Sequence, residues 1–327
     1  MQRVSIVIPI KDHASFLPAL FESLCQQTFK DFNVIIVDSS CPEEKLLIQE
    51  IISKHKEFFE IKYHSLTSLN PGEARNFGIA QSNSEIIAFL DSRTLPLPDW
   101  LNRYITYFDE NKLEFYQGSF VTSADSYFQR IVKAATYGNL VFNSLPGSLL
   151  LLNRFREVGD FANVRAGEDQ DWLKRANQVL RTRESKDGLI IYKGMPETLF
   201  EFLKKWFVYS MENAKINIEI AQKLSYGTLV AVLLAYFFYS WNYFFTDLRW
   251  DSSPFFVPNL NKIIWSLVLV SYFFYRSLIL PKRKGIKLSF LFPLNWIVVG
   301  IISIIGDLMK LPGRIIGFIY LLFHFFK

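Results

Sequence analysis

The stretch VSIVIPIKDHASFLPALFESLCQQTFKDFNVIIVDSS, residues 4–40, decides the fold class. Residues 4–8 form a short β-branched run that ends at Pro9, and residues 32–37 form a second run that stops at Asp38. Both runs are typical of buried parallel strands. Apolar residues at helical spacing predict a helix over residues 17–28 between them.

The same alternation continues along the chain. Helices are expected over residues 43–58 and 73–80, and a strand over residues 85–90 that ends at Asp91. This order predicts an α/β fold, a mostly parallel sheet flanked by helices with right-handed crossovers. Ligands bind such sheets beyond the carboxyl ends of the strands, where Asp38 and Asp91 lie. No Gly-rich turn follows the first strand, which argues against a nicotinamide or flavin enzyme.

The last third of the chain is apolar. Stretches of about the length that crosses a bilayer as a helix, roughly 20 residues, occur at 226–246, 263–280 and 288–306. A final run at 315–326 is too short to span and suits an interfacial helix. Residues 197–216 mix aromatic residues with Lys204-Lys205, which fits either an amphipathic helix on the membrane or an ordinary domain helix.

We therefore expect three parts: an α/β domain over 1–196, a juxtamembrane amphipathic helix over 197–223 and a membrane region over 224–327. The net charge is +5, with basic residues beside the apolar stretches. This excess favours an anionic membrane surface over nucleic acid, with a solubilising surface as the alternative. The basic loop 282–287 predicts a multi-pass protein of the cell membrane with its first domain in the cytosol. The third stretch either crosses or is re-entrant at Pro293.

Three blocks of sequence resemble family 2 glycosyltransferases of the GT-A fold. They are residues 4–40, NPGEARNFGIAQSNSEIIAFLDSRTLPLPDWL at 70–101, and PGSLLLLNRFREVGDFANVRAGEDQDWLKRA at 146–176. The blocks occur in the order that the family shows. The resemblance implies a nucleotide-sugar donor and a GT-A type domain followed by membrane anchors.

The resemblance also implies donor-binding residues: Pro9, Asp38, Arg75 and Asp91. A carboxylate at the end of a strand can accept a hydrogen bond from a base or a ribose hydroxyl, and the alternative for Asp38 is a turn-former. A cation near pyrophosphate is electrostatically apt, and the alternative for Arg75 is a surface salt bridge.

Asp91 matches the first acid of the family's Asp-any-Asp motif, which helps to hold a divalent cation. Here the motif reads Asp91-Ser92-Arg93, and Tyr192-Lys193 stands where many relatives carry a His. Arg cannot coordinate Mg²⁺ or Mn²⁺, so the metal site is in doubt. Three hypotheses follow: Arg93 neutralises the pyrophosphate, Asp91 alone holds the metal, or the protein is inactive.

Glu168-Asp169 matches the acidic pair of the family, in which Asp169 would be the general base and the reaction would invert the anomeric centre. The alternative is that both acids complement a helix N-terminus. Pro146, Gly147 and Ser148 resemble the segment that lines the acceptor side. No Gln-x-x-Arg-Trp motif follows, which favours addition of a single sugar.

The sequence thus predicts an inverting glycosyltransferase that moves one sugar from a nucleotide-sugar to a lipid-linked or membrane-proximal acceptor, in cell-envelope glycan biosynthesis. The alternative is a catalytically lapsed GT-A domain that serves as a binding or scaffold subunit. The expected partners are the donor, the glycan acceptor and the lipid bilayer, with a homo-oligomer left open and no nucleic acid.

Overall fold

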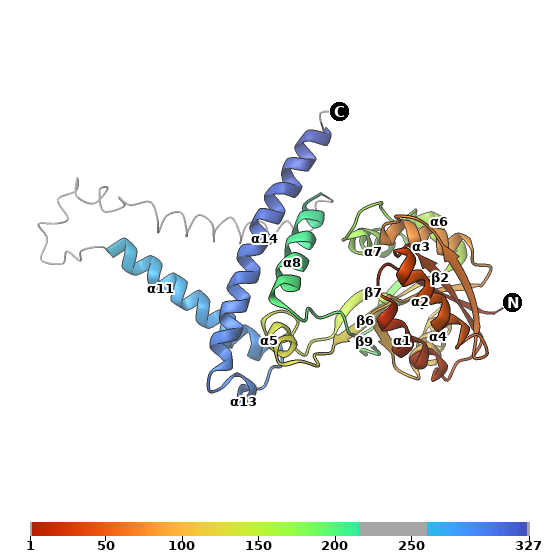
Figure 1. The fold of residues 1–327 in the computed structure, drawn as a ribbon, viewed down its shortest axis with the longest axis horizontal. Helices are drawn as coiled ribbons and strands as arrows, with labels where there is room; N and C mark the ends of the chain where they lie inside the picture. The colour runs from red at the N-terminus through yellow and green to blue at the C-terminus, as the bar shows by residue number, and fades with distance from the viewer. Residues whose placement is uncertain (1, 216–259, 326–327) are drawn as a thin grey trace, which may run out of the picture. The chain divides into compact units, whose positions relative to one another are not determined.

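The computed structural model describes residues 2–215 and 260–325 of the 327-residue chain. These residues fall into two compact units, Met1–Gln129 with Asn139–Glu197, and Arg130–Gly138 with Thr198–Lys327 (Figure 1). The predicted apolar segment 226–246 and the end of the predicted juxtamembrane helix, residues 216–223, lie outside the described residues.

The first unit is built on a nine-stranded sheet in the order β3-β2-β1-β4-β7-β6-β9-β5, with β8 beside β6. β1 pairs in parallel with β2 and β4, and β2 pairs in parallel with β3. β7 is antiparallel to β4 and β6, and β5 is antiparallel to β9, so the sheet is mixed. The predicted α/β fold is confirmed. The strands are β1 (Val4–Ile10), β2 (Phe32–Asp38), β3 (Glu60–Ser65), β4 (Ile86–Phe89), β5 (Thr94–Pro96), β6 (Phe115–Thr122), β7 (Phe142–Leu151), β8 (Thr182–Glu184) and β9 (Ile190–Tyr192).

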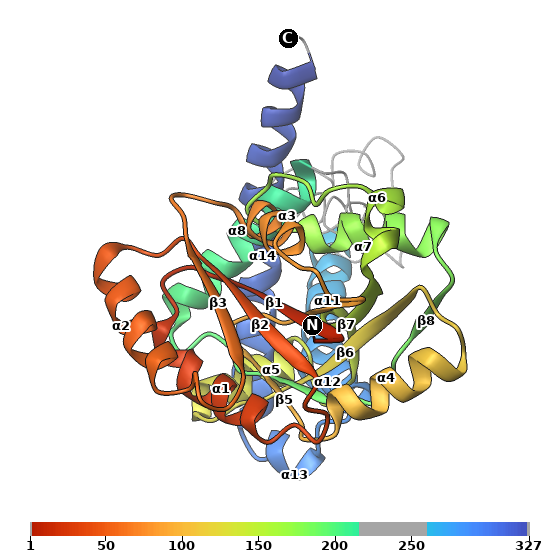
Figure 2. The ribbon, with the colours of Figure 1, turned by 90° about the vertical axis from the view of Figure 1, so that its right-hand side faces the viewer.

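Helices cover both faces of this sheet, as Figure 2 shows. Successive side chains of a strand point to opposite faces, so Ile6 and Ile8 of β1 pack into one core and Val7 into the other. The first core receives α1, α2 and α4, and the second receives α3 and α7. The helices of the first unit are η1 (Ala14–Phe16), α1 (Leu17–Cys25), α2 (Pro42–Ser53), α3 (Pro71–Ala80), α4 (Trp100–Glu110), η2 (Leu152–Arg154), α6 (Phe155–Val158) and α7 (Glu168–Val179).

The helix ends differ from the predicted ones for local reasons. The helix predicted over 17–28 ends at Cys25, because the Gln27 side chain turns to bond Leu97 O and Leu101 N of a distant segment. α3 begins two residues earlier than predicted, at Pro71. Its first turn is capped by Glu73, which accepts a hydrogen bond from the Asn70 N–H at 3.0 Å.

The second unit is helical within its described residues. Its helices are α5 (Tyr127–Ala135), which enters this unit at Arg130, α8 (Leu199–Lys215), α11 (Leu260–Phe274), the π-helical turn η4 (Tyr275–Ile279), α12 (Leu280–Arg283), α13 (Leu288–Leu291) and α14 (Asn295–Phe325). α8 and α14 lie side by side (Figure 1). Small residues let them approach: a Cβ at Gly313 would stand 2.4 Å from Phe207 O, and one at Gly317 would stand 2.3 Å from Met211 O. Such glycine-mediated contact is common between helices in membranes.

The apolar segments have other ends than the sequence predicts. The stretch 288–306 is divided by a turn at residues 292–294 into α13 and the start of α14. The run 315–326, expected as a separate interfacial helix, continues α14 through Pro312 to Phe325. Residues 263–280 lie in α11, η4 and the first residue of α12.

One helix of the described residues, Asn295–Tyr320, is long and apolar enough to cross a membrane. The described part of the chain therefore supports one candidate span where the sequence predicted several. The second unit also exposes large apolar side chains, among them Leu267, Leu294 and Phe318.

Candidate active site

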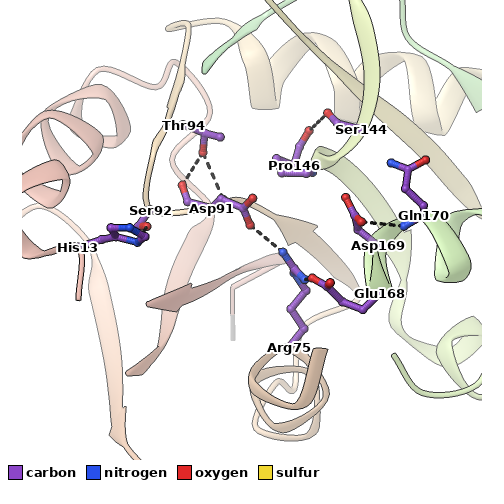
Figure 3. Close-up of polar contacts among 10 residues, drawn as sticks. All are labelled: His13, Arg75, Asp91, Ser92, Thr94, Ser144, Pro146, Glu168, Asp169 and Gln170. Carbon is purple, nitrogen blue, oxygen red and sulfur yellow. Dashed lines mark hydrogen bonds and ion pairs between the residues drawn. The ribbon is translucent and has the colours of Figure 1, made fainter. Parts of the chain in front are cut away.

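Arg75 joins two of the three sequence blocks on which the family resemblance rests, its own block 70–101 and the block 146–176. Its Nη1 lies 2.6 Å from Glu168 Oε1 and its Nη2 lies 2.8 Å from Asp91 Oδ1 (Figure 3). Arg75 comes from α3, Asp91 from the end of β4 and Glu168 from the start of α7. Residues 75, 91 and 168 therefore meet at one place, as the sequence predicts for a ligand site at the carboxyl ends of the strands.

Arg75 is nevertheless buried, with only 4% of its surface exposed. Burial opposes its charge, but the carboxylates of Asp91, Glu168 and Asp169 outweigh that cost and keep its pKa above the ordinary value. The guanidinium also lies 5.7 Å from the centre of the Phe161 ring. The predicted alternative of a surface salt bridge is wrong, because the Arg75–Glu168 pair is almost fully enclosed.

Glu168 and Asp169 open α7 directly after Gly167, which adopts a φ of 90°. Burial raises the pKa of Glu168, and Arg75 opposes that shift. Burial likewise raises the pKa of Asp169, with Arg75 opposing and the negative charge of Asp91 adding to the effect. Asp169 Oδ1 accepts the N–H of Gln170 at 2.8 Å. Asp169 is therefore a carboxylate whose affinity for a proton is raised, as a general base requires.

Asp91 occupies a tight turn instead of an extended loop. Its carbonyl accepts the Thr94 N–H at 3.1 Å and the Thr94 hydroxyl at 2.6 Å. An extended loop would place the side chains of residues 91 and 93 on the same side, but the turn removes that relation. The Arg93 guanidinium instead lies 5.9 Å from the centre of the Tyr192 ring.

His13 belongs to this region and was not predicted from the sequence. It follows the carboxyl end of β1, and its Nδ1 lies 3.4 Å from Ser92 Oγ (Figure 3). Burial lowers its pKa and Arg93 adds to that shift, while Asp12 and Asp91 oppose it. The position after a parallel strand was the available signal, but no motif distinguishes His13 from the other histidines.

Asp38 is fully buried at the end of β2. Its Oδ1 accepts the Ser40 N–H at 2.8 Å and its Oδ2 accepts the Tyr63 hydroxyl at 2.7 Å. Burial and this bond to Asp38 raise the pKa of Tyr63 to about 12. These contacts are those of a turn-forming carboxylate, so contact between Asp38 and a donor stays a prediction. Pro9 pairs with Val37 across β1 and β2, one residue before this turn.

Pro146, Gly147 and Ser148 are buried within β7. The Ser148 hydroxyl accepts the Gly118 N–H at 2.8 Å, and Gly147 O accepts the Trp100 indole N–H at 3.0 Å. A Cβ at Gly147 would stand 2.7 Å from Ile190 Cγ1. Packing between strands thus accounts for Gly147, and the acceptor-side role of the three residues stays a prediction.

The residues around Asp91 offer few ligands to a divalent cation. Asp91 Oδ1 and Glu168 Oε1 are engaged by Arg75, and the next motif position is Arg93. Among residues 2–215 and 260–325, no group of three or more His, Cys, Asp or Glu is arranged to hold a metal ion. This donor set does not fit the family's usual Mg²⁺ or Mn²⁺ site.

A mixed α/β sheet with Asp91 and the acid pair Glu168–Asp169 beyond its strand ends is typical of a GT-A type domain. The family described as Glycosyl transferase family 2 matches residues 5–175. The chain belongs to this family.

Two curated relatives illustrate the match. An uncharacterized glycosyltransferase of Rickettsia bellii is 28% identical over 176 residues, which cover 51% of this chain and 25% of the relative. The pre-mycofactocin glycosyltransferase of Mycobacterium tuberculosis is 35% identical over 107 residues, 32% of this chain and 21% of the relative. The match thus spans about a quarter of the length of these relatives.

A mannosyltransferase from Pyrobaculum calidifontis, solved in complex with GDP-Man and Mn²⁺, has a similar structure. The TM-score is 0.53 at 13% identity, covering 95% of this chain and 87% of that chain. This likeness confirms the fold.

Proposed function

We propose that this protein is an inverting glycosyltransferase that moves one sugar from a nucleotide-sugar to a lipid-linked or membrane-proximal acceptor. The observation that carries the proposal is the Arg75 network, in which one buried cation pairs with Asp91 and with Glu168, the first residue of the acid pair at α7. Family membership supports the reaction class.

In the proposed reaction, the acceptor hydroxyl attacks the anomeric carbon from the face opposite the nucleoside diphosphate. The new C–O bond forms as the bond to the phosphate oxygen breaks, and the hydroxyl proton passes to Asp169. The diphosphate leaves with the bonding electron pair. The raised pKa of Asp169 supports this role, because a base that holds a proton more tightly accepts it more readily in the transition state.

Arg75 is a positioning residue in this proposal, since its two guanidinium nitrogens are engaged by Glu168 and Asp91. Other cations must then stabilise the negative charge of the leaving diphosphate. Arg93 comes directly before β5 and Lys193 directly after its partner strand β9, and the Lys193 N–H donates to Arg93 O at 2.8 Å. We propose that Arg93 neutralises part of that charge in place of a metal, since guanidinium matches phosphate oxygens in a bidentate fork.

Membrane attachment is part of the same proposal. The candidate span Asn295–Tyr320, the exposed apolar side chains of the second unit and the basic loop 282–287 support it. We propose that the first domain lies on the cytosolic face. An acceptor at the membrane follows from that attachment, and the absence of the Gln-x-x-Arg-Trp motif favours a single addition.

The proposal is tested by a panel of UDP-, GDP- and TDP-sugars offered to the full chain in detergent. A ligand that binds the folded state raises its melting temperature, and we expect one base to stand out. Asp91→Asn should reduce the rise in melting temperature that the nucleotide-sugar causes. Asp187→Asn, which alters an exposed ion pair of the same unit, should leave that rise unchanged. Donor binding without turnover on any membrane extract would favour the catalytically lapsed alternative.

A further inference from the structure

The segment that leads into the acid pair, residues 159–167, is the approach loop. It connects α6, which ends at Val158, to α7, which begins with Glu168. The structure describes the whole of this loop, and the loop lies outside the helices and strands. Since no ladder of regular backbone hydrogen bonds fixes its conformation, other contacts must do so. These contacts decide where Glu168 and Asp169 stand.

Asn76 of α3 binds the backbone of the approach loop at Phe161. The Asn76 side chain accepts the Phe161 N–H at 2.9 Å through Oδ1 and donates to Phe161 O at 3.0 Å through Nδ2. One amide thus satisfies both backbone groups of Phe161, as a neighbouring β-strand would. Phe161 is buried, so loss of the amide would leave both groups short of a partner.

The ring of Phe161 contacts both parts of the candidate active site. It stacks on Trp172 of α7, with ring centroids 4.8 Å apart, and the Arg75 guanidinium lies 5.7 Å from its centre. Arg75 in turn pairs with Glu168 (Figure 3). Trp172 lies four residues after Glu168, about one turn along α7. Asn76 therefore holds the residue against which Arg75 and the first turn of α7 pack.

A second set of contacts holds the approach loop along the start of α3. Asn163 accepts the Asn70 Nδ2–H at 2.6 Å and donates to Glu73 Oε1 at 2.7 Å. A Cβ at Gly72 would stand 2.4 Å from Ala162 O. The backbone of the loop therefore runs directly against the first turn of α3.

These contacts add something that the packing of the helices does not supply. Ile79 of α3 and Leu173 and Ala176 of α7 belong to one buried apolar core, which holds the two helices together without Asn76. Asn76 fixes the residues that come directly before the acid pair. A general base must lie within hydrogen-bond reach of the proton it accepts, and a displacement of about 1 Å can lower a rate by about a hundredfold.

We propose that Asn76 is a positioning residue for the transfer reaction. By binding the backbone of Phe161, it places Asp169 where the acceptor hydroxyl can pass its proton to it. Asn76 itself contacts neither the donor nor the acceptor. This inference rests on the proposed function, in which Asp169 is the general base.

The test compares Asn76→Ala with Gln27→Ala in the full chain in detergent. Gln27 is a matched control, because its buried amide donates to Leu97 O at 2.8 Å and accepts the Leu101 N–H at 3.2 Å. Both variants should lose a similar amount of thermal stability. Asn76→Ala should lower turnover by at least about tenfold with donor affinity within about threefold of wild type, whereas Gln27→Ala should keep turnover within about threefold. Wild-type turnover in Asn76→Ala would overturn the proposal.

A double-mutant cycle with Asp169→Asn separates positioning from a structural role. When the base is absent, its position no longer matters, so Asn76→Ala should lower the residual rate of Asp169→Asn by less than about twofold. A structural role predicts the same fold loss in both backgrounds, and that result would overturn the inference alone. Near-normal turnover by Asp169→Asn would instead contradict the proposed function.

Hydrogen exchange gives a readout that needs no turnover. Backbone amides of residues 161–169 should exchange at least about tenfold faster in Asn76→Ala and should be unchanged in Gln27→Ala. Protection equal to wild type in Asn76→Ala would overturn the proposal whatever the activity. If Asn76→Ala fails to fold, Asn163→Ala replaces it, because Asn163 is exposed. Asn163→Ala should lower turnover by about threefold and speed the same exchange, and wild-type behaviour in both would overturn the proposal.

Discussion

Replacing Arg75 by Met removes the cation that compensates the buried Glu168. The side chains of this pair expose 5% and 6% of their surface, and their atoms lie 2.6 Å apart. Breaking a buried pair on one side costs about 3–5 kcal/mol, because the remaining charge is left without compensation. Asp91 is 35% exposed, so solvent screens its share and we assign it less than about 1 kcal/mol.

For a unit of this size, that loss corresponds to a fall in melting temperature of roughly 6–20 °C. The assay is thermal unfolding of the full chain, followed by tryptophan fluorescence at neutral pH. Arg103→Met is the matched control, because Arg103 and Asp187 form an exposed pair with 50% and 37% of their side chains accessible. That control should change the free energy of unfolding by under about 1 kcal/mol.

The double variant Arg75→Met/Glu168→Gln makes the test specific. Replacing both partners by uncharged groups of similar shape removes the buried charge, so at least half of the lost stability should return. The reasoning is refuted if Arg75→Met is no less stable than Arg103→Met, or if the double variant is no more stable than Arg75→Met alone.

Three further predictions concern the metal, the pH profile and the membrane. The affinity for the donor should be retained in EDTA and lost in Arg93→Ala. If the affinity is instead lost in EDTA and unchanged in Arg93→Ala, a divalent metal ion neutralises the diphosphate. Only the ionised Asp169 accepts a proton, and burial raises its pKa. On acidification the transfer rate should therefore begin to fall at a pH above about 4, the ordinary pKa of Asp. A rate that falls only at or below that pH contradicts the role of Asp169 as general base. The chain should stay with membranes in carbonate and in high salt, because α14 is long and apolar enough to span; release by either treatment would show surface attachment.

The sequence predicted the sheet well because its signals are local. The β-branched runs that end at Pro9 and Asp38 each contain enough information to define a strand. Asp91 and Arg75 were likewise placed at the site by their motifs. The role of Arg75 could not be predicted, because its partner Glu168 is 93 residues away and burial depends on the packing of α3 against α7.

Two other features depend on tertiary context. Arg93, in the turn that closes through the Thr94 hydroxyl, lies over the ring of Tyr192 in β9, and no local sequence pattern encodes this contact. The continuity of α14 was not predicted, because the charged residues Asp307, Lys310 and Arg314 separate the apolar runs 288–306 and 315–326 in the sequence. In the structure α14 continues through Pro312, and its next residue, Gly313, packs on α8.

The most direct test of the central claim is the transfer rate of Asp169→Asn. The measurement is release of nucleoside diphosphate and labelling of a membrane-lipid extract with the nucleotide-sugar that the binding panel selects. Asp171→Asn is the control, since Asp171 lies in the same turn of α7 and pairs with Arg175. The account predicts loss of transfer by at least about a hundredfold in Asp169→Asn, with donor affinity retained and Asp171→Asn near wild type. Near-normal turnover by Asp169→Asn would contradict it.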